Sequence, residues 1–239
     1  MLAICAALSW EIRPILRAIG PIKRSHDGAM QLWQSTSRTE PVVVFQTGIG
    51  CEAAIKATRR VLGCLPIRTV VNTGCAGALV RGLTVGSVVV PSSVLDLSNG
   101  RHDADEACVL RLREAARRAG LSSNGGPILT SPTVLASKTE KSVAHERFGA
   151  TAVEMEGYAV ADVAREHGSR FGSVRAILDT SELDLPAGDT AAGTLKLALR
   201  TVTAPRTRPL VISLANAVNA VQTSLEALFR CFLDETSSD

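Results

Sequence analysis

The amino-acid sequence predicts a single α/β domain in which a buried sheet is flanked by helices. The chain has 239 residues, which suits one sizeable domain. Apolar residues make up 46% of it and aromatic residues only 3%, so we expect a core of Val, Leu, Ile and Ala, as in a buried sheet. Strand-like apolar runs also alternate with segments of helical pattern, which is typical of α/β folds.

Strands are identified from short apolar runs bounded by Gly, Pro or polar residues, and helices from apolar residues spaced three or four apart. No repeat or linker interrupts this order, so we expect one domain over residues 1–233 and a frayed tail over 234–239. The expected strands are residues 2–8, PVVVFQ ending near Gln46, IRTVV before a glycine-rich turn in NTGCAGA, VGSVVVPSSVL, and FGSVRAIL ending at Asp179, and the expected helices are 52–62, 105–119, 138–147 and the long segment RPLVISLANAVNAVQTSLEALFRCFL.

Charge and hydropathy argue against two classes of protein. A formal net charge of +3 without a basic stripe is too mild to indicate nucleic-acid binding. The first residues lack the basic region of a signal peptide, and no apolar run is long enough to span a membrane. We therefore expect a cytoplasmic protein that binds neither nucleic acid nor membrane.

Cysteine and histidine patterns do not indicate a metal site. The six cysteines form no CxxC pair and stand mostly inside apolar runs, so we expect reduced, buried thiols. The histidines form neither HxH nor HExxH. The segment RHDADEA resembles a set of ligands, but a solvated loop that enters a helix is the simpler interpretation. No metal is expected.

Polar or glycine-rich residues follow four of the expected strands, at residues 9–11, 47–50 and 73–77 and at Asp179. In α/β folds, ligands bind beyond the carboxyl ends of the strands. We therefore expect these four segments to converge on one pocket.

Two glycine-rich segments could place backbone close to a ligand. TGIGCEA contains Gly48-x-Gly50-x-x-Ala53, a loose dinucleotide fingerprint, but no acidic residue ends a second strand about twenty residues later, as NAD binding requires. A turn whose N–H groups face an oxyanion or hydroxyl is the better interpretation, and a turn that needs glycine only for its dihedral angles is the alternative. In NTGCAGAL, Gly74 and Gly77 would let a bulky ligand approach the backbone.

Cys75, between those two glycines, invites interpretation as a nucleophile. No histidine stands near it in the sequence, so a small, semi-buried thiol is the preferred interpretation.

The stretch AVEMEGYAVA places Glu154 and Glu156 on either side of Met155, where a helix is expected to begin. A carboxylate in a first helical turn is stabilised as an anion by backbone N–H groups, and it accepts hydrogen bonds from hydroxyls well. A favourable charge at a helix end is the alternative.

Two further carboxylates follow strands. Asp179 follows an apolar strand, so partial burial could raise its pKa and let it act as an acid, with a cap or turn aspartate as the alternative. Glu11 follows the first strand, and a glutamate in an early helical turn is its alternative.

Together, AALSWEI, TGIG, NTGCAGAL, VEMEG and VRAILD occur in an order and spacing that resemble the nucleoside phosphorylase family, and within it the methylthioadenosine/S-adenosylhomocysteine nucleosidases. The resemblance implies a three-layer α/β/α fold around a mixed, partly barrel-like central sheet. It implies cleavage of the N-glycosidic bond between a purine base and ribose. It also implies a homo-oligomer, with a dimer favoured, and no cofactor.

The resemblance implies roles for individual residues. Glu156 would accept hydrogen bonds from the ribose hydroxyls, and Met155 would pack against the sugar. Asp179 would protonate the departing purine, and Glu11 would activate the attacking water. For Glu154, helix-end or hydrogen-bond support is expected.

Three positions depart from the family pattern: Cys75 and Leu178 stand where serine is common, and Leu135 stands near where an aromatic residue often stacks on adenine. The expected substrate is a 5′-modified adenosine. Another purine, a bulky apolar 5′ substituent, or a futalosine-type or hopanoid-linked nucleoside remains open.

Hydrolysis is favoured over phosphorolysis. Glu11 would repel phosphate and suits the activation of water, although Arg13 is close in sequence and could hold phosphate as a co-substrate. The third alternative is a nucleoside-binding protein without catalysis. Glu11, Glu156 and Asp179 together argue against it.

Overall fold

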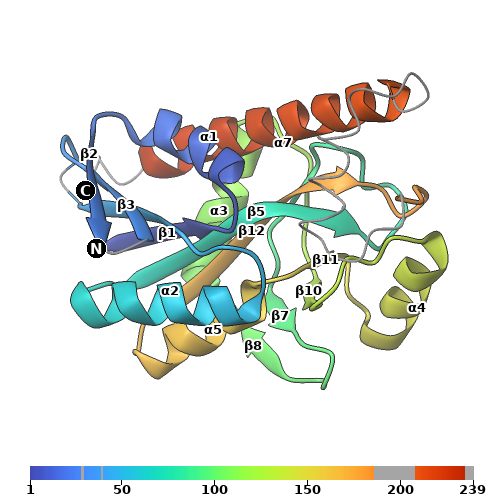
Figure 1. Cartoon of the computed structure of the whole chain (residues 1–239), viewed down its shortest axis with the longest axis horizontal. Helices are drawn as coiled ribbons and strands as arrows, with labels where there is room; N and C mark the ends of the chain where they lie inside the picture. Colours follow the sequence, from blue (N-terminus) through green and yellow to red (C-terminus); the bar gives the residue numbers. More distant parts are fainter. Residues whose placement is uncertain (28–29, 39, 186–207, 235–239) are drawn as a thin grey trace.

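A mixed sheet lies at the centre of the protein, between helices (Figure 1). The structure is a computed structural model that describes residues 1–27, 30–38, 40–185 and 208–234, and over these residues twelve strands form the sheet. The strands are β1 (Leu2–Ala6), β2 (Ile22–Asp27), β3 (Met30–Ser35), β4 (Val42–Gln46), β5 (Thr69–Ala78), β6 (Val88–Val89), β7 (Ser93–Leu95), β8 (Arg101–Asp103), β9 (Ser123–Asn124), β10 (Pro127–Thr130), β11 (Ala152–Glu154) and β12 (Arg170–Asp179). The helices are α1 (Ser9–Ile19), α2 (Cys51–Cys64), α3 (Glu106–Arg118), α4 (Lys138–Phe148), α5 (Gly157–Glu166) and α7 (Arg208–Asp234).

Helices cover the sheet in two layers, which confirms the three-layer α/β/α prediction. Helices α1, α3 and α7 pack on one face, and α2 and α5 pack on the other (Figure 1). Strand β1 shows the reason: Leu2, Ile4 and Ala6 belong to the first core, while Ala3 and Cys5 belong to the second. Successive side chains of a strand point to opposite faces, so a strand buried on both sides reads as a continuous apolar run.

The sheet branches at β5 and stays open. Its strands follow the order β2-β3-β4-β1-β5-β11-β10-β7-β8, and β12 forms a second branch that pairs with β5 and β6. Strand β1 pairs in parallel with β4 and β5, and β5 pairs in parallel with β12 along almost its whole length. Through the described strands, this pairing does not close into a ring, so the expected barrel character is limited to a branched, open sheet.

The glycine-rich turn expected in NTGCAGA was wrong, because β5 continues through this segment to Ala78. Pairing with β1 ends at Asn72, and β11 pairs with Gly77 and Ala78, while β12 pairs with β5 from Thr69 to Gly77. Gly74 has a φ of +142°, a backbone conformation that residues with a Cβ rarely adopt. The glycines therefore allow the strand to change partners rather than to turn back.

The single strand expected in VGSVVVPSSVL is two strands, β6 and β7, with Pro91 between them. Proline has no N–H to donate to a ladder, so pairing stops there. Strand β6 then pairs with β9 and β12, and β7 pairs with β8 and β10.

Side chains satisfy the backbone groups that helices leave unpaired. Pro14 lies inside α1 and cannot donate to the carbonyl of Trp10; the side-chain amide of Gln222 in α7 donates to that carbonyl at 2.8 Å. Asp105 caps α3 by accepting from the Cys108 N–H, so RHDADEA leads into a helix as expected, but its first three residues form strand β8 rather than a loop.

The other expected helices correspond to α2, α4 and α7. Part of the expected loop after Asp179 lies outside the described residues, as do residues 235–239 of the expected frayed tail, whereas Asp234 belongs to α7. In the part of the chain that the structure describes, no helix has the length and apolar character needed to cross a bilayer. All six cysteines carry free thiols, but only Cys5 and Cys108 are buried, because the other four are half-buried or, in the case of Cys64, exposed.

Candidate active site

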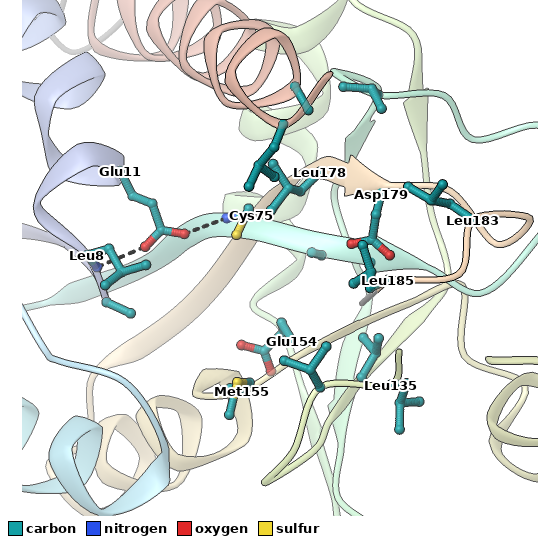
Figure 2. Close-up of a pocket in the computed structure, with 18 of the residues that line it drawn as sticks. Leu8, Glu11, Cys75, Leu135, Glu154, Met155, Leu178, Asp179, Leu183 and Leu185 are labelled. Carbon is teal, nitrogen blue, oxygen red and sulfur yellow. Dashed lines mark hydrogen bonds between the residues drawn. The ribbon is translucent and has the colours of Figure 1, made fainter. Parts of the chain in front are cut away.

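A cavity of about 540 Å³ lies at the carboxyl ends of the central strands (Figure 2). All four segments that the sequence placed at strand ends contribute to it: Glu11 after β1, Ile49 after β4, residues 75–77 of β5, and Asp179 at the end of β12. Parallel strands present their carboxyl ends at one edge of a sheet, which explains this convergence. The remaining walls come from the β11–α5 junction, the segments around Leu135 and Leu183, and α7.

Glu11 is buried at the start of α1, with 2% of its surface exposed. One carboxyl oxygen accepts the N–H of Leu8 at 2.9 Å, and the other accepts the N–H of Cys75 at 2.8 Å (Figure 2). Burial raises the pKa of the Glu11 carboxyl above its ordinary value, although both N–H groups act to lower it. A carboxylate with a raised pKa is a better proton acceptor near neutral pH.

The glycines of β5 make room for two carboxylates. A Cβ on Gly74 would lie 2.6 Å from Oε1 of Glu11, and a Cβ on Gly77 would lie 3.2 Å from both oxygens of Asp179. The expectation that these glycines admit a ligand to the backbone is therefore corrected for Gly74, which does not line the pocket, whereas Gly77 does. Figure 2 shows Glu11 on one side of Cys75 and Asp179 on the other.

Cys75 lines the pocket but is poorly suited to nucleophilic attack. Burial, and after it the neighbouring Glu11 carboxylate, raises the pKa of the Cys75 thiol well above its ordinary value. The thiolate is the reactive form of cysteine, so this environment keeps the side chain inert.

Glu156 lies at the β11–α5 junction with 5% of its surface exposed. Its Oε1 accepts the N–H of Gly50 at 2.7 Å, and no described residue is recorded as bonding to Oε2. Burial, and after it the Glu154 carboxylate, raises the pKa of Glu156 from 4.5 to about 8. The expectation that helix α5 holds Glu156 as an anion was therefore wrong, because its carboxyl group accepts no N–H of that helix.

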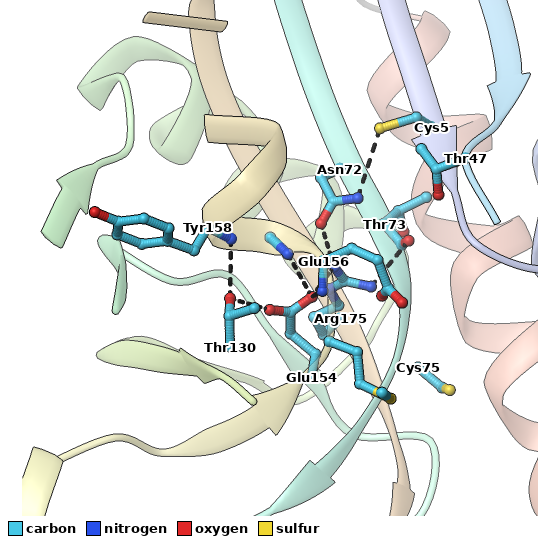
Figure 3. A network of polar contacts seen from close by, with 12 residues as sticks. Cys5, Thr47, Asn72, Thr73, Cys75, Thr130, Glu154, Glu156, Tyr158 and Arg175 are labelled. Atoms are coloured by element: carbon cyan, nitrogen blue, oxygen red, sulfur yellow. Dashed lines mark hydrogen bonds and ion pairs between the residues drawn. The ribbon is translucent and has the colours of Figure 1, made fainter. Parts of the chain in front are cut away.

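Glu154 accepts the helix N–H groups instead. Its Oε2 accepts the N–H of Glu156 at 2.9 Å and that of Gly157 at 2.7 Å, while Oε1 accepts the hydroxyl of Thr130 (Figure 3). The guanidinium of Arg175 donates to the same carboxylate. All of these groups are buried, so Glu154 is a saturated acceptor that holds the strand-to-helix junction together.

Arg175 is a charged residue that the sequence reasoning missed. It lies in the middle of β12 with 1% of its surface exposed, and it donates to Glu154, Asn72 and the carbonyl of Thr73 (Figure 3). It is not among the residues that line the pocket. The only signal in the sequence was one arginine inside the otherwise apolar SVRAIL, where a charge requires a buried partner.

Lys141 is the second charged residue that the sequence did not reveal. It lies on α4 and is completely buried. Its ammonium donates to Oδ2 of Asp179 at 2.6 Å and to the carbonyls of Thr180 and Leu183, both at 2.9 Å. Burial raises the pKa of Asp179 above its ordinary value, while the Lys141 ammonium lowers it.

The rest of the pocket is mostly apolar, with Thr133, Ser213 and Asn216 as the other polar residues described in its lining. Met155 and Leu135 both line it, as do Leu8, Leu178 and Leu183 (Figure 2). The only charged side chains that the described residues contribute to its lining are four carboxylates, namely Glu11, Glu154, Glu156 and Asp179. The pocket therefore combines a few convergent acids with hydrophobic walls, as small-molecule sites commonly do.

Three other expected features do not form part of the pocket. Gly48 has a φ of +83° but does not line the pocket, and Gly50 reaches it only through its hydrogen bond to Glu156. Arg13 is exposed and also lies outside the lining. Among the residues with described positions, no group of three or more His, Cys, Asp or Glu side chains could hold a metal ion.

Curated relatives cover most of the chain. It is 28% identical over 210 residues to a 5′-methylthioadenosine/S-adenosylhomocysteine nucleosidase of Actinobacillus succinogenes, an alignment that covers 80% of this chain and 88% of the relative. It is 26% identical over 195 residues to the enzyme of the same name from Haemophilus influenzae, covering 74% of this chain and 85% of the relative.

Solved structures share the fold over almost the whole chain. The 5′-methylthioadenosine/S-adenosylhomocysteine nucleosidase of Neisseria meningitidis superposes with a TM-score of 0.79 at 20% identity, covering 98% of both chains. Futalosine hydrolase of Helicobacter pylori superposes with a TM-score of 0.79 at 20% identity, covering 98% of this chain and 97% of that one. A family model described as the phosphorylase superfamily matches residues 2–204. Since this match spans most of the sequence, the chain belongs to the phosphorylase superfamily.

Proposed function

We propose that this protein is an enzyme that hydrolyses the N-glycosidic bond of a 5′-modified adenosine-type nucleoside and needs no cofactor. The observation that carries the proposal is the convergence of Glu11, Glu156 and Asp179, from three separate elements, on one largely apolar pocket. Curated relatives named as nucleosidases over most of the chain support the same reaction.

Each carboxyl group has a distinct task in this reaction. Asp179 donates a proton to the purine ring as the bond between C1′ and the base nitrogen breaks. The electron pair of that bond stays on the nitrogen, and the protonated purine leaves as a neutral base. A water oxygen bonds to C1′, and Glu11 accepts the proton that the water loses. The products are the free base and the free sugar. General acid catalysis of this kind contributes about two to four powers of ten to the rate.

Glu156 is assigned to the ribose hydroxyls. Because bond cleavage places positive charge on the ribosyl ring, an ionised Glu156 stabilises the transition state more than the bound substrate. The pKa of Glu156 in the folded protein is about 8, so Glu156 is mostly protonated at neutral pH. The developing positive charge favours its anion, and this interaction is therefore strongest where it accelerates the reaction. Met155 packs against the sugar beside it.

Water rather than phosphate is the proposed nucleophile. Phosphate sites in proteins are usually built with arginine or lysine. No such side chain lines the pocket within the described part of the chain, so a phosphate would find no cationic partner beside the four carboxyl groups of the lining. Arg175 is buried outside the lining and its charge is paired with Glu154.

The 5′ substituent is proposed to be apolar. Once the four carboxylates are assigned, the side chains left on the pocket wall are mostly aliphatic, including Leu8, Val85 and Leu214. An amino-acid tail with its own charges would find no basic partner among the described lining residues. Leu135 and Leu178 add to this apolar surface. They stand at the two positions where the family resemblance implies an aromatic residue and a serine, respectively.

The test is chromatography of a nucleoside panel incubated with purified protein, with and without phosphate. The panel contains adenosine, inosine, 5′-methylthioadenosine, a longer 5′-alkylthioadenosine and S-adenosylhomocysteine. We expect free base without phosphate, and faster turnover of the alkylthio nucleosides than of S-adenosylhomocysteine. Strict dependence on phosphate, with ribose-1-phosphate as the product, would replace hydrolysis by phosphorolysis. Tight binding without turnover would indicate a binding protein.

We further propose a homodimer in the cytoplasm. The resemblance to a family whose members commonly dimerise supports the oligomeric state, and the reduced cysteines support the compartment. Light scattering of the purified chain measures the mass: twice 25.1 kDa is expected, and a mass of one chain would contradict the dimer.

A further inference from the structure

The contacts of Lys141 connect the proposed acid to the wall of the pocket. Its ammonium has three hydrogens, and the three recorded acceptors are Oδ2 of Asp179, the Thr180 carbonyl and the Leu183 carbonyl. The side chain is 0% exposed, so it makes these bonds without competition from water. One residue of α4 therefore holds both the end of β12 and the loop that follows it.

The two oxygens of Asp179 are in different environments. Oδ2 accepts from Lys141, whereas no described residue is recorded as donating to Oδ1. Gly77 leaves space beside the carboxyl group, since a Cβ there would lie 3.2 Å from each oxygen. With Oδ2 occupied, Oδ1 is the oxygen that can reach a base in the pocket.

We propose that Lys141 is a positioning residue for protonation of the base: it fixes one oxygen of Asp179, leaves the other for the purine, and ties the acid to the pocket wall. This inference rests on the proposed function. Lys141 itself touches neither base nor sugar, because it is not among the residues that line the pocket. It acts through Asp179, whose acidity it adjusts.

The electrostatic effect of Lys141 opposes that of burial. Burial raises the pKa of Asp179 and would leave it a weak acid, while the adjacent ammonium lowers that pKa. A general acid works best when its pKa lies near the working pH, because a weaker acid transfers its proton less readily. The lysine therefore keeps a buried aspartic acid strong enough to protonate the purine.

Other charges near the pocket do not perform this task. Within the described part of the chain, Lys141 is the only charged group that shifts the pKa of Asp179. In the loop after β12, Glu182 and Asp184 have side chains that are 68% and 61% exposed, so solvent screens them. The other charged groups around the pocket are Glu11 of α1, Glu154 and Glu156 at the β11–α5 junction, and Arg175 of β12.

The same lysine fixes a wall of the pocket. Leu183, whose carbonyl it binds, lines the pocket together with Leu185. The loop is also held to the start of α4, since Leu185 donates its N–H to the Ala136 carbonyl at 2.8 Å and Asp184 accepts the Lys138 N–H at 2.8 Å. Loss of the Lys141 side chain should therefore loosen the wall as well as weaken the acid.

The experiment compares Lys141→Met with Lys138→Met in the full-length protein. Lys138 lies on the same helix, but its side chain is 56% exposed and its ammonium reaches only Asp184, at 3.8 Å. It therefore controls for loss of a lysine from α4. Lys141→Gln is a second neutral variant that can still donate a hydrogen bond, and it carries the test if Lys141→Met does not fold.

The first readout needs no substrate. Titration of the ¹³C-labelled Asp179 carboxyl group, assigned with Asp179→Asn, gives its pKa in each protein. We expect a rise of about one unit or more in both Lys141 variants, equivalent to about 1.4 kcal/mol per unit, and no change in Lys138→Met. This result stands even if the protein turns over no nucleoside, so it separates failure of the lysine assignment from failure of the proposed reaction.

The second readout is the pH profile of kcat/KM for the best nucleoside of the panel. Because Asp179 must carry its proton, activity falls at alkaline pH as it ionises. A higher pKa therefore moves that limb to higher pH in the Lys141 variants, while the maximum falls about tenfold or more. An alkaline limb and a carboxyl titration that stay in place while turnover falls would show a merely structural lysine and overturn the proposal.

Discussion

Glu154 and Glu156 are two residues apart and equally buried, but their environments differ. Glu154 accepts from two backbone N–H groups, from Thr130 and from Arg175, so the fold uses both of its oxygens. Glu156 lines the pocket and accepts one hydrogen bond, from the Gly50 N–H, and no described residue donates to its other oxygen. The extent of burial does not explain why their hydrogen bonding differs, because each residue is 5% exposed.

The difference shows how a buried charge can serve either stability or chemistry. A charge whose hydrogen-bonding capacity is filled is costly to disturb but has nothing left to offer a ligand. A buried carboxylate with one oxygen left without a donor destabilises the folded protein, as the raised pKa of Glu156 shows, and a ligand that donates to that oxygen can offset the cost. Glu154 therefore supports the site that Glu156 serves.

The largest expected effect is on stability, in Glu154→Gln. The substitution keeps the shape but leaves the Arg175 guanidinium buried without its ion-pair partner. Loss of one member of a buried pair costs about 3–5 kcal/mol of unfolding free energy. Urea denaturation followed by circular dichroism measures it, and a loss below about 1 kcal/mol would show that Asn72 and Thr73 alone can hold the arginine.

In contrast to Glu154→Gln, Glu156→Gln should lower activity and leave stability intact. Its neutral amide matches the protonated state of Glu156 in the folded protein, so stability at pH 7 should be unchanged or higher. Turnover should fall by about two to three powers of ten, as when one preorganised electrostatic contact to a transition state is removed. Steady-state kinetics and denaturation are measured on the same preparation; full activity in the variant would remove Glu156 from the site.

The pH dependence of stability tests the same contrast. Between pH 4.5 and about pH 8, Glu156 holds its proton in the folded protein but has lost it in the unfolded chain. The folded state therefore binds more protons in this window, and the contribution of Glu156 to stability declines as pH rises through it. The wild-type protein should lose unfolding free energy relative to Glu156→Gln between pH 5 and pH 8. A constant difference would mean that the pKa of Glu156 is not raised.

Thr130→Val should give the smallest effect. The valine keeps the volume but removes the hydroxyl that donates to Glu154 and accepts the Tyr158 N–H at 2.9 Å. Buried groups left without a partner cost about 1–3 kcal/mol. Thermal and urea unfolding should show this loss while kcat/KM changes little, because Thr130 does not line the pocket. A loss of activity without a loss of stability would contradict the structural role given to Glu154.

Much of the fold could be predicted from the sequence, because its main strands are local apolar patterns. The strands ending at Gln46 and Asp179, and the helices α2, α3, α4 and α7, follow from such patterns. The change of partner along β5, from β1 to β11, could not be predicted, since it depends on which strands lie beside β5 in the fold. The sequence also does not distinguish two strands on either side of Pro91 from a single bent strand.

The site was predictable only in part. Glu11, Glu156 and Asp179 were predicted because each follows an expected strand or stands where a helix begins. The topology of an α/β fold brings such positions together. Their partners come from distant parts of the chain: Glu156 binds Gly50, and Asp179 binds Lys141. Nothing in KTEKSVAHERF distinguishes the buried Lys141 from the exposed Lys138, because partners across a fold leave no local pattern.

The most direct test of the division between the two glutamates uses the substrate as well as the protein. The value of kcat/KM is measured for the wild type and Glu156→Gln with the preferred nucleoside and with its 2′-deoxy and 3′-deoxy analogues. If Glu156 holds the ribose hydroxyls, loss of a hydroxyl that it contacts should cost the wild type about tenfold or more, equivalent to 1.4 kcal/mol, and cost Glu156→Gln far less. The same factor in both proteins, for both analogues, would contradict the assignment.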